Sequence, residues 1–188
     1  MGFLRNILAL LGLLVLVGLG WGAMTFRGFD PAAGRLYLNL AGELARSGNP
    51  AEAMVWKREV AEGLSYEEVD ESIRSLAMDL NIRDVGALPL GDQVAAMKGA
   101  PWRKLKVYLY CNPLTAAAMV DYATAYAAWL PCRVSLVEDE QGRLWLYTLN
   151  MDYMLHGGRP LPADVAAQGE AVRNSILSLM DKAAEGDF

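Results

Sequence analysis

The ten residues Lys-Leu-Lys-Val-Tyr-Leu-Tyr-Cys-Asn-Pro (104–113) decide the fold, because they contain a strand and the start of a helix. Aliphatic residues stand at every second position, which is typical of a β-strand with one face in the core. Asn112 is a favoured N-cap residue, and Pro113 is a favoured first residue of a helix. The aliphatic residues, which we assign to the core, are Leu105, Val107 and Leu109.

The chain after this strand returns as a β-hairpin. An alanine-rich stretch predicts that the helix continues to about Trp129, and Pro131 marks its end. Residues 132–138 alternate as a second strand, a polar turn follows, and residues 143–149 form the partner strand. A last helix is predicted after Pro162, because apolar residues recur there at helical spacing.

The chain before this strand supplies the rest of the domain. Ser65 and Glu68 form a capping box, which predicts a helix from Tyr66 to Leu80. Strands are predicted within 54–64 and near 85–88, and a short helix near 92–98. The predicted fold is α+β, with a mixed sheet of four or five strands and helices packed on it in two layers.

An apolar segment precedes the domain. The eighteen residues from Ile7 to Met24 carry no charge. As a helix they reach about 27 Å, close to the roughly 30 Å of a bilayer's hydrocarbon layer. The apolar core of a cleavable signal peptide is the alternative, but it is usually shorter. We therefore expect an uncleaved, single-pass transmembrane anchor.

The flanking charges suggest how this anchor is oriented. Arg5 and the terminal amine favour a cytoplasmic N-terminus, whereas Arg27 and Arg35 oppose it. Because the N-terminal tail is short, we expect the domain on the periplasmic side of a bacterial inner membrane. Gly18 and Gly22 form a small-x-x-x-small pair that would let two anchors pack closely, although glycine is common in membrane helices.

These segments define four expected parts of the chain. The anchor occupies residues 1–26 and a juxtamembrane helical connector occupies 27–52. Pro31 opens the connector helix, which the run from Ser47 to Pro50 breaks. The α+β domain occupies residues 53–156, and a C-terminal helix packed on it occupies 157–188.

The composition excludes several classes of protein. The 188 residues include 17 basic and 22 acidic side chains, for a net charge of −5, so a nucleic-acid partner is not expected. Two cysteines and one histidine cannot build a disulfide framework or a His-rich metal site. The common phosphate-binding and nucleophile motifs are missing. We expect no cofactor, no metal and no catalytic residue.

The chain resembles the bacterial domain-of-unknown-function family 302. The resemblance rests on Cys111-Asn112-Pro113 closing a strand, Leu130-Pro131-Cys132-Arg133-Val134 opening the next, and the acidic turn and hairpin return that follow. It covers roughly residues 55–156, and the anchor, connector and last helix outside it resemble a membrane-bound subgroup. The resemblance implies a compact α+β domain that often self-associates, and it implies no established reaction.

The two cysteines are candidate reactive thiols. A strand, a return helix and a second strand usually run parallel, which would place Cys111 and Cys132 at opposite sheet edges, on the order of 15–20 Å apart. A disulfide needs Cα atoms within about 7 Å, so we expect none. The simplest interpretation is that both are small buried hydrophobic residues. The alternative is a reactive thiol at Cys111, beside a helix N-terminus.

The second face of the central strands is a candidate contact surface. Aromatic rings beside cations suit a protein partner or a flat ligand. The alternative is that a helix covers these rings as a second core face. The candidate contact residues are Lys106, Tyr108, Tyr110, Arg133, Trp145 and Tyr147.

These observations favour a non-enzymatic, membrane-anchored binding or assembly domain. Its partner would be a second copy of the chain, giving a homo-oligomer, or another membrane protein. The alternative function is a thiol- or metal-linked redox accessory protein that uses Cys111 and Cys132. A weaker alternative is a sensor that binds a small ligand under the loop 150–158. The sequence does not identify a ligand.

Overall fold

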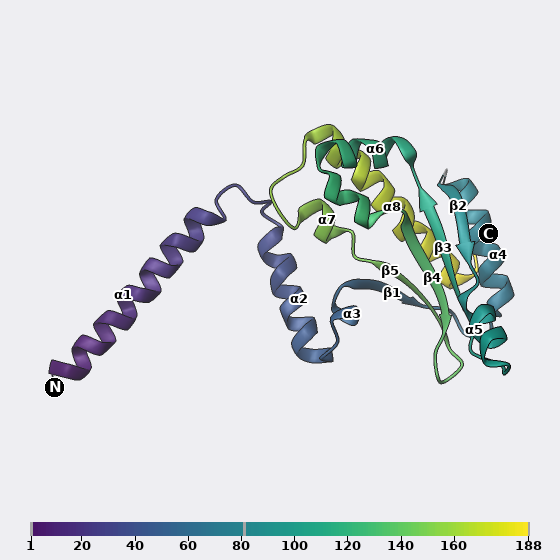
Figure 1. Ribbon diagram of the computed structural model, residues 1–188, viewed down its shortest axis with the longest axis horizontal. Helices are drawn as coiled ribbons and strands as arrows, with labels where there is room; N and C mark the ends of the chain where they lie inside the picture. The colour runs from purple at the N-terminus through teal and green to yellow at the C-terminus, as the bar shows by residue number, and fades with distance from the viewer. Residues whose placement is uncertain (1, 81, 188) are drawn as a thin grey trace.

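The computed structural model describes residues 2–80 and 82–187 and shows an α+β fold. Five strands form one open sheet in the order β1-β5-β4-β3-β2, with helices α4 and α8 behind it (Figure 1). The strands are β1 (Val55–Glu59), β2 (Arg83–Leu88), β3 (Leu105–Cys111), β4 (Cys132–Glu138) and β5 (Leu144–Leu149). The helices of the domain are α4 (Tyr66–Asp79), α5 (Leu90–Lys98), α6 (Pro113–Tyr122), η1 (Thr124–Trp129), α7 (Asp152–His156) and α8 (Ala163–Glu185).

All neighbouring strands are antiparallel, so the expectation of a mixed sheet is wrong. The cause lies between β3 and β4, where one helix to Trp129 was expected. The α-helix α6 ends at Tyr122, Ala123 is extended, and the 3₁₀-helix η1 packs back against α6. Helix α6 leads away from the end of β3 and η1 leads back to it. β4 therefore begins beside the end of β3 and runs antiparallel to it.

The predicted helix starts are confirmed where a cap specifies them. The Ser65 hydroxyl accepts from the backbone N–H of Glu68, and the Glu68 carboxylate accepts from the N–H of Ser65, completing the capping box of α4. At α6, the Asn112 side chain accepts from two backbone N–H groups of the first turn. Each cap satisfies donors that a helix start leaves unpaired.

The core lies between the sheet and the helices α4 and α8. Val69, Ile73 and Leu76 of α4 and Ile176 and Leu179 of α8 are fully buried there. From the sheet, the side chains that join them are Tyr108, Tyr110, Val134, Leu136 and Leu146. Burying such side chains stabilises the fold by about 1.5–3 kcal/mol each, before the loss of conformational entropy is counted.

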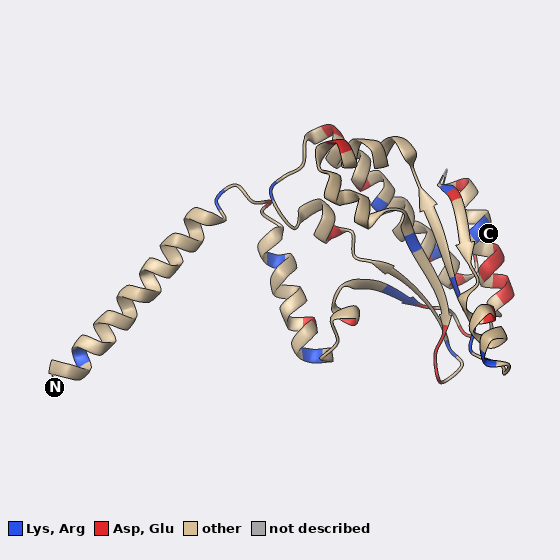
Figure 2. Cartoon of the chain, viewed as in Figure 1, with Lys and Arg blue, Asp and Glu red and all other residues tan. Residues whose placement is uncertain are grey.

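The N-terminal part stands apart from the domain. Helix α1 (Gly2–Thr25) is long and apolar enough to cross a membrane and has no buried residue. It projects away from the domain and carries one charged residue, Arg5 (Figures 1 and 2). Helix α2 (Ala33–Ser47) follows as predicted, ends at Gly48 in the left-handed conformation, and leads through α3 (Pro50–Ala53) into β1.

Candidate binding face

One face of the sheet is covered by α4 and α8, and we call the opposite surface the open face. Figure 1 views the sheet from this side, with α8 behind the strands. The strand register places residues across it in rows. The middle row, from β1 to β2, contains Lys57, Tyr147, Ser135, Val107 and Leu88.

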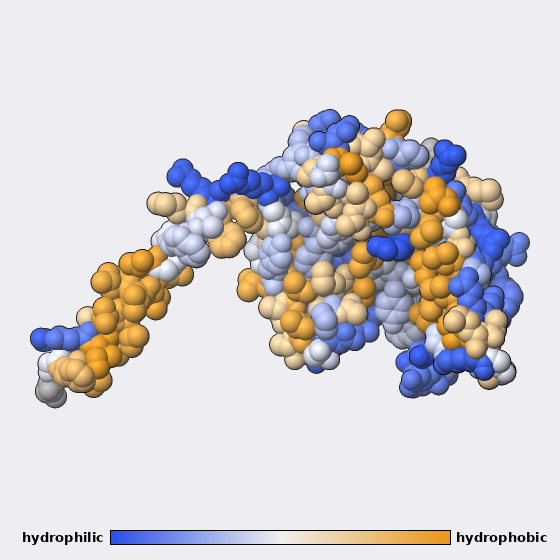
Figure 3. Space-filling model, in the orientation of Figure 1, coloured by the Kyte–Doolittle hydropathy of each residue, from blue (hydrophilic) through white to orange (hydrophobic). Residues whose placement is uncertain are grey.

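The open face has an aliphatic half and an aromatic half. On the β3 side, Leu105, Val107 and Leu109 are half-buried, and apolar side chains gather along these strands beside a shallow hollow (Figure 3). On the β5 side, Trp145 and Tyr147 lie with their ring centroids 6.2 Å apart. Large hydrophobic side chains left on a surface in this way often mark an interaction site.

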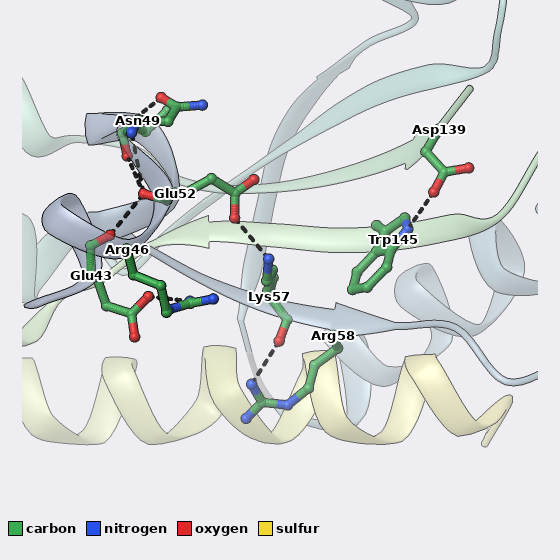
Figure 4. Close-up of polar contacts among 10 residues, drawn as sticks. Glu43, Arg46, Asn49, Glu52, Lys57, Arg58, Asp139 and Trp145 are labelled. Carbon is green, nitrogen blue, oxygen red and sulfur yellow. Dashed lines mark hydrogen bonds and ion pairs between the residues drawn. The ribbon is translucent and has the colours of Figure 1, made fainter. Parts of the chain in front are cut away.

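Cations surround the aromatic half. Lys57 Nζ lies 5.7 Å from the centre of the Trp145 ring, and the Arg143 guanidinium carbon lies 5.4 Å from it. The Trp145 Nε1–H donates to Asp139 at 3.0 Å, and Lys57 donates to Glu52 at 2.7 Å (Figure 4). The hydrogen bond to Glu52 raises the pKa of Lys57. These contacts hold the indole ring in one position.

The six predicted contact residues do not share one face. Arg133, Trp145 and Tyr147 lie on the open face, as the register of β3, β4 and β5 shows. The other three lie on the covered face: Lys106, Tyr108 and Tyr110. Tyr108 and Tyr110 are 1% and 0% exposed, so the alternative of a second core face is correct for them.

A charged residue of α4 explains why Lys106 and Tyr108 lie on the covered face. Asp70 accepts hydrogen bonds from Lys106 Nζ at 2.7 Å and 3.0 Å and from the Tyr108 hydroxyl. Burial alone would raise the pKa of Asp70, but the bonds from Lys106 and Tyr108 outweigh it and lower the pKa. Burial and the bond to Asp70 raise the pKa of Tyr108. The polar groups of Asp70, Lys106 and Tyr108 are therefore paired, which makes their burial tolerable, whereas the buried Tyr110 hydroxyl has no hydrogen-bond partner.

Sequence reasoning missed the aliphatic residues of the open face. The prediction that Leu105, Val107 and Leu109 face the core is wrong, because alternation alone does not say which face is buried. A useful signal lay in the next strand, where Val134 and Leu136 alternate with Arg133 and Ser135. That pattern identifies the buried face of β3 only once Tyr108 is known to pair with the buried Val134, because paired residues lie on the same face of the sheet.

The cysteines are neighbours, so their predicted separation at opposite sheet edges is wrong. The antiparallel register pairs Tyr110 with Cys132, and Cys111 follows Tyr110 directly. Both cysteines are half-buried free thiols. Burial raises the pKa of Cys132 to about 11, so this thiol stays protonated at neutral pH.

His156 joins three separate parts of the chain. It ends α7, and its ring nitrogens bond to Asp30 at 3.0 Å and to Glu170 of α8 at 2.7 Å. Nearby, the Tyr37 hydroxyl of α2 donates to the carbonyl of Gly157 at 2.7 Å. His156 thus ties the connector to the domain, and both of its ring nitrogens are engaged away from the cysteines.

This tie is expected to weaken as pH rises. Burial lowers the pKa of His156, but the hydrogen bonds and charges of Asp30 and Glu170 outweigh it and raise the pKa above the ordinary 6.5. The stabilisation is fully present below that value and is lost as pH rises through the raised pKa of the folded state. Amide hydrogen exchange in α2, corrected for its intrinsic pH dependence, should therefore become faster.

His156→Gln is the control for this experiment, because glutamine cannot gain a proton in this range. Its corrected exchange in α2 should be independent of pH between 5 and 8. An equal acceleration in the wild-type and variant proteins would contradict the prediction.

The described residues contain no group of three or more His, Cys, Asp or Glu side chains that could hold a metal ion. The open face presents half-buried aliphatic and aromatic side chains for binding. Its chemistry suits hydrophobic contact with a polar rim, as in protein–protein interfaces.

Comparisons with known proteins agree with this fold. The family model described as "Domain of unknown function DUF302" matches residues 56–183. The match includes most of α8 and extends beyond residue 156, where the resemblance in the sequence ends. The crystal structure of an uncharacterized conserved DUF302 protein from Bacillus stearothermophilus is similar, with a TM-score of 0.55 and 12% identity. The similarity covers 69% of this chain and 98% of that one. No match was found among curated proteins.

Proposed function

The chain belongs to the DUF302 family, and since that family's description names no reaction, we propose that it is a membrane-anchored, non-enzymatic assembly domain. Its open face binds the same face of a second copy. The observation that carries this proposal is the sheet face itself, whose middle row has Ser135, Val107 and Tyr147 at its centre and a charged side chain, Lys57, only at one end.

The two halves of the open face are complementary to each other. A twofold axis along β4 places β3 of one copy opposite β5 of the other. Val107 and Leu88, at the aliphatic end of the middle row in one copy, then lie opposite Tyr147 and Lys57 of the other copy. Twofold symmetry forms this contact twice in one interface, as is usual for dimers.

The size of the face indicates that the anchor contributes. Five strands about 4.8 Å apart, each with roughly six residues of 3.3 Å, give a footprint on the order of 500 Å². A standard interface buries about 800 Å² on each partner, so this face alone gives weak association. Two copies held in one membrane by α1 raise each other's effective concentration, and Gly18 and Gly22 leave room for the anchors to approach.

The proposed location is an inner membrane, with α1 crossing it once and the domain on the periplasmic side. The apolar length of α1 supports a span. Arg5, which precedes the apolar run, supports the direction.

Native mass spectrometry of the full chain in mild detergent tests this proposal. The wild-type chain should be a dimer. The double variant Trp145→Ala/Tyr147→Ala should be mainly monomeric, because aromatic residues central to an interface often contribute about 2 kcal/mol each, or roughly 30-fold in affinity.

Tyr122→Ala is the matched control, because Tyr122 is an exposed aromatic residue on α6, outside the open face. It should remain dimeric, and thermal unfolding should show that all variants are folded. A wild-type monomer, or a dimer that the double variant retains, would rule out assembly through this face.

A further inference from the structure

Five sulfur-containing residues line one small cavity at the end of the sheet. Figure 1 shows α6, α7 and α8 meeting in this region, beyond the end of β3. The cavity has a volume of about 20 Å³. The chain contains two cysteines and nine methionines, and both cysteines and three of the methionines line this cavity. They are Cys111, Cys132, Met119, Met151 and Met154.

The rest of the lining is neutral. It contains no carboxylate, imidazole, ammonium or guanidinium group. Two of its polar side chains are already engaged: Asn112 caps α6, and the Tyr126 hydroxyl donates to the carbonyl of Met154 at 3.2 Å. A hard cation such as Mg²⁺ or Ca²⁺ needs several oxygen ligands and is disfavoured here.

We propose that this cavity binds one Cu(I) ion, with the sulfur atoms of Cys111 and Cys132 as its main ligands and methionine thioethers completing the site. Thiolate and thioether ligands select soft metals, Cu(I) among them. Methionine favours Cu(I) over Zn(II), since zinc sites use Cys, His and carboxylate ligands. The Cys132 thiol is protonated before copper arrives, so the ion displaces one proton to solvent from each thiol that coordinates it. The copper stays Cu(I), so no electron is transferred. This site is separate from the open face and does not depend on the proposed assembly.

The size of the cavity agrees with a single ion. A water molecule needs about 10–15 Å³ of such volume, so 20 Å³ holds one desolvated ion and no larger ligand. A second cavity of about 310 Å³ shares Cys111 and Cys132 with the first, and we assign it as the entrance.

The alternative is that these methionines only fill the core, as methionine often does. Leucine substitutions separate the two roles, because leucine keeps most of the volume and removes the sulfur. Met119 is fully buried and is the informative position, whereas Met97 is 89% exposed on α5 and is the matched control.

The test is a competition for Cu(I) between the reduced, full-length chain and bicinchoninate, a coloured Cu(I) chelator, without oxygen. The wild-type chain should remove one equivalent of copper. Cys111→Ser/Cys132→Ser should weaken binding at least 100-fold, and Met119→Leu about tenfold. Met97→Leu should bind as the wild type does. Zn(II) should not compete, since it favours four Cys, His or carboxylate ligands.

A chain that leaves all the copper with bicinchoninate would overturn the proposal, as would full binding by the double cysteine variant. If that variant does not fold, the wild-type chain still gives an answer. Copper should slow alkylation of the two thiols by iodoacetamide, and X-ray absorption should show sulfur neighbours around copper. Unchanged alkylation, or copper bound only by nitrogen and oxygen, would refute the site.

Discussion

Replacing Asp70 with alanine should lower the free energy of unfolding by about 3 kcal/mol, which is a large effect for one side chain. The substitution leaves the Lys106 ammonium and the Tyr108 hydroxyl without their shared acceptor. The Lys106 side chain is only 12% exposed and that of Asp70 21%, so water replaces the lost bonds poorly. Breaking a buried ion pair from one side typically costs about 3–5 kcal/mol, and the partial exposure of Asp70 places this case at the lower end. Urea unfolding of the full chain, followed by tryptophan fluorescence, measures the change.

Two further variants show whether the unpaired cation is the cause. Lys106→Met added to Asp70→Ala should recover much of the loss, since the second change removes the buried charge. Glu71→Ala, at an exposed neighbouring position on α4, should change stability by less than about 0.5 kcal/mol. An Asp70→Ala chain as stable as the wild type would contradict this account.

The same cluster gives a pH dependence of defined sign. The folded-state pKa of Asp70 lies below its ordinary value of 3.8, mainly because the bonds from Lys106 and Tyr108 outweigh the effect of burial. Its contribution is therefore present above about pH 4 and is lost as pH falls through the lowered pKa. The stability difference between the wild type and Asp70→Ala should shrink in that acidic range.

Replacing Ser135 with glutamate should abolish self-association, with a dissociation constant at least 100-fold higher. Ser135 lies on the central strand β4, between Tyr147 and Val107 on the open face. A twofold interface along β4 would bring the two new carboxylates together and bury both, and like charges in contact cost several kcal/mol. Folding should be little affected, because this position is only half-buried in a single copy. Analytical ultracentrifugation in detergent measures the association.

Ser135→Ala provides the matched control at the same position. Alanine removes the hydroxyl and adds no charge, so the dimer should persist with nearly unchanged affinity. A dimer that tolerates Ser135→Glu would show that copies associate elsewhere, for example through α1 alone. That result would exclude the open face without excluding assembly.

Much of the fold could be predicted because local signals specify it. The capping box at Ser65 and the Asn112-Pro113 pair each mark a helix start that depends on neighbouring residues only. The hairpin of β4 and β5 follows from alternation on both sides of a polar turn. Such features need no knowledge of the tertiary structure.

The direction of β4 and the buried face of β3 could not be predicted in this way. The first depends on a single extended residue, Ala123, which divides the expected helix into two passes. The second depends on Asp70, which is close to Lys106 and Tyr108 only after α4 packs on the sheet. The neighbouring positions of Cys111 and Cys132 follow from the direction of β4. The wrong prediction of that direction therefore also gives the wrong separation of the two cysteines.

The contact between Asp30 and His156 also limits how far the domain can travel. Asp30 follows the end of α1 at Thr25 by five residues, and an extended chain spans at most about 3.5 Å per residue. With α1 in a membrane, the tied end of the domain stays within about 17 Å of the bilayer surface. The domain is then restricted to a thin layer beside the lipid headgroups, where it meets molecules attached to the same membrane far more often than those in the surrounding solution. Release of His156 would lengthen this tether by the residues of the connector.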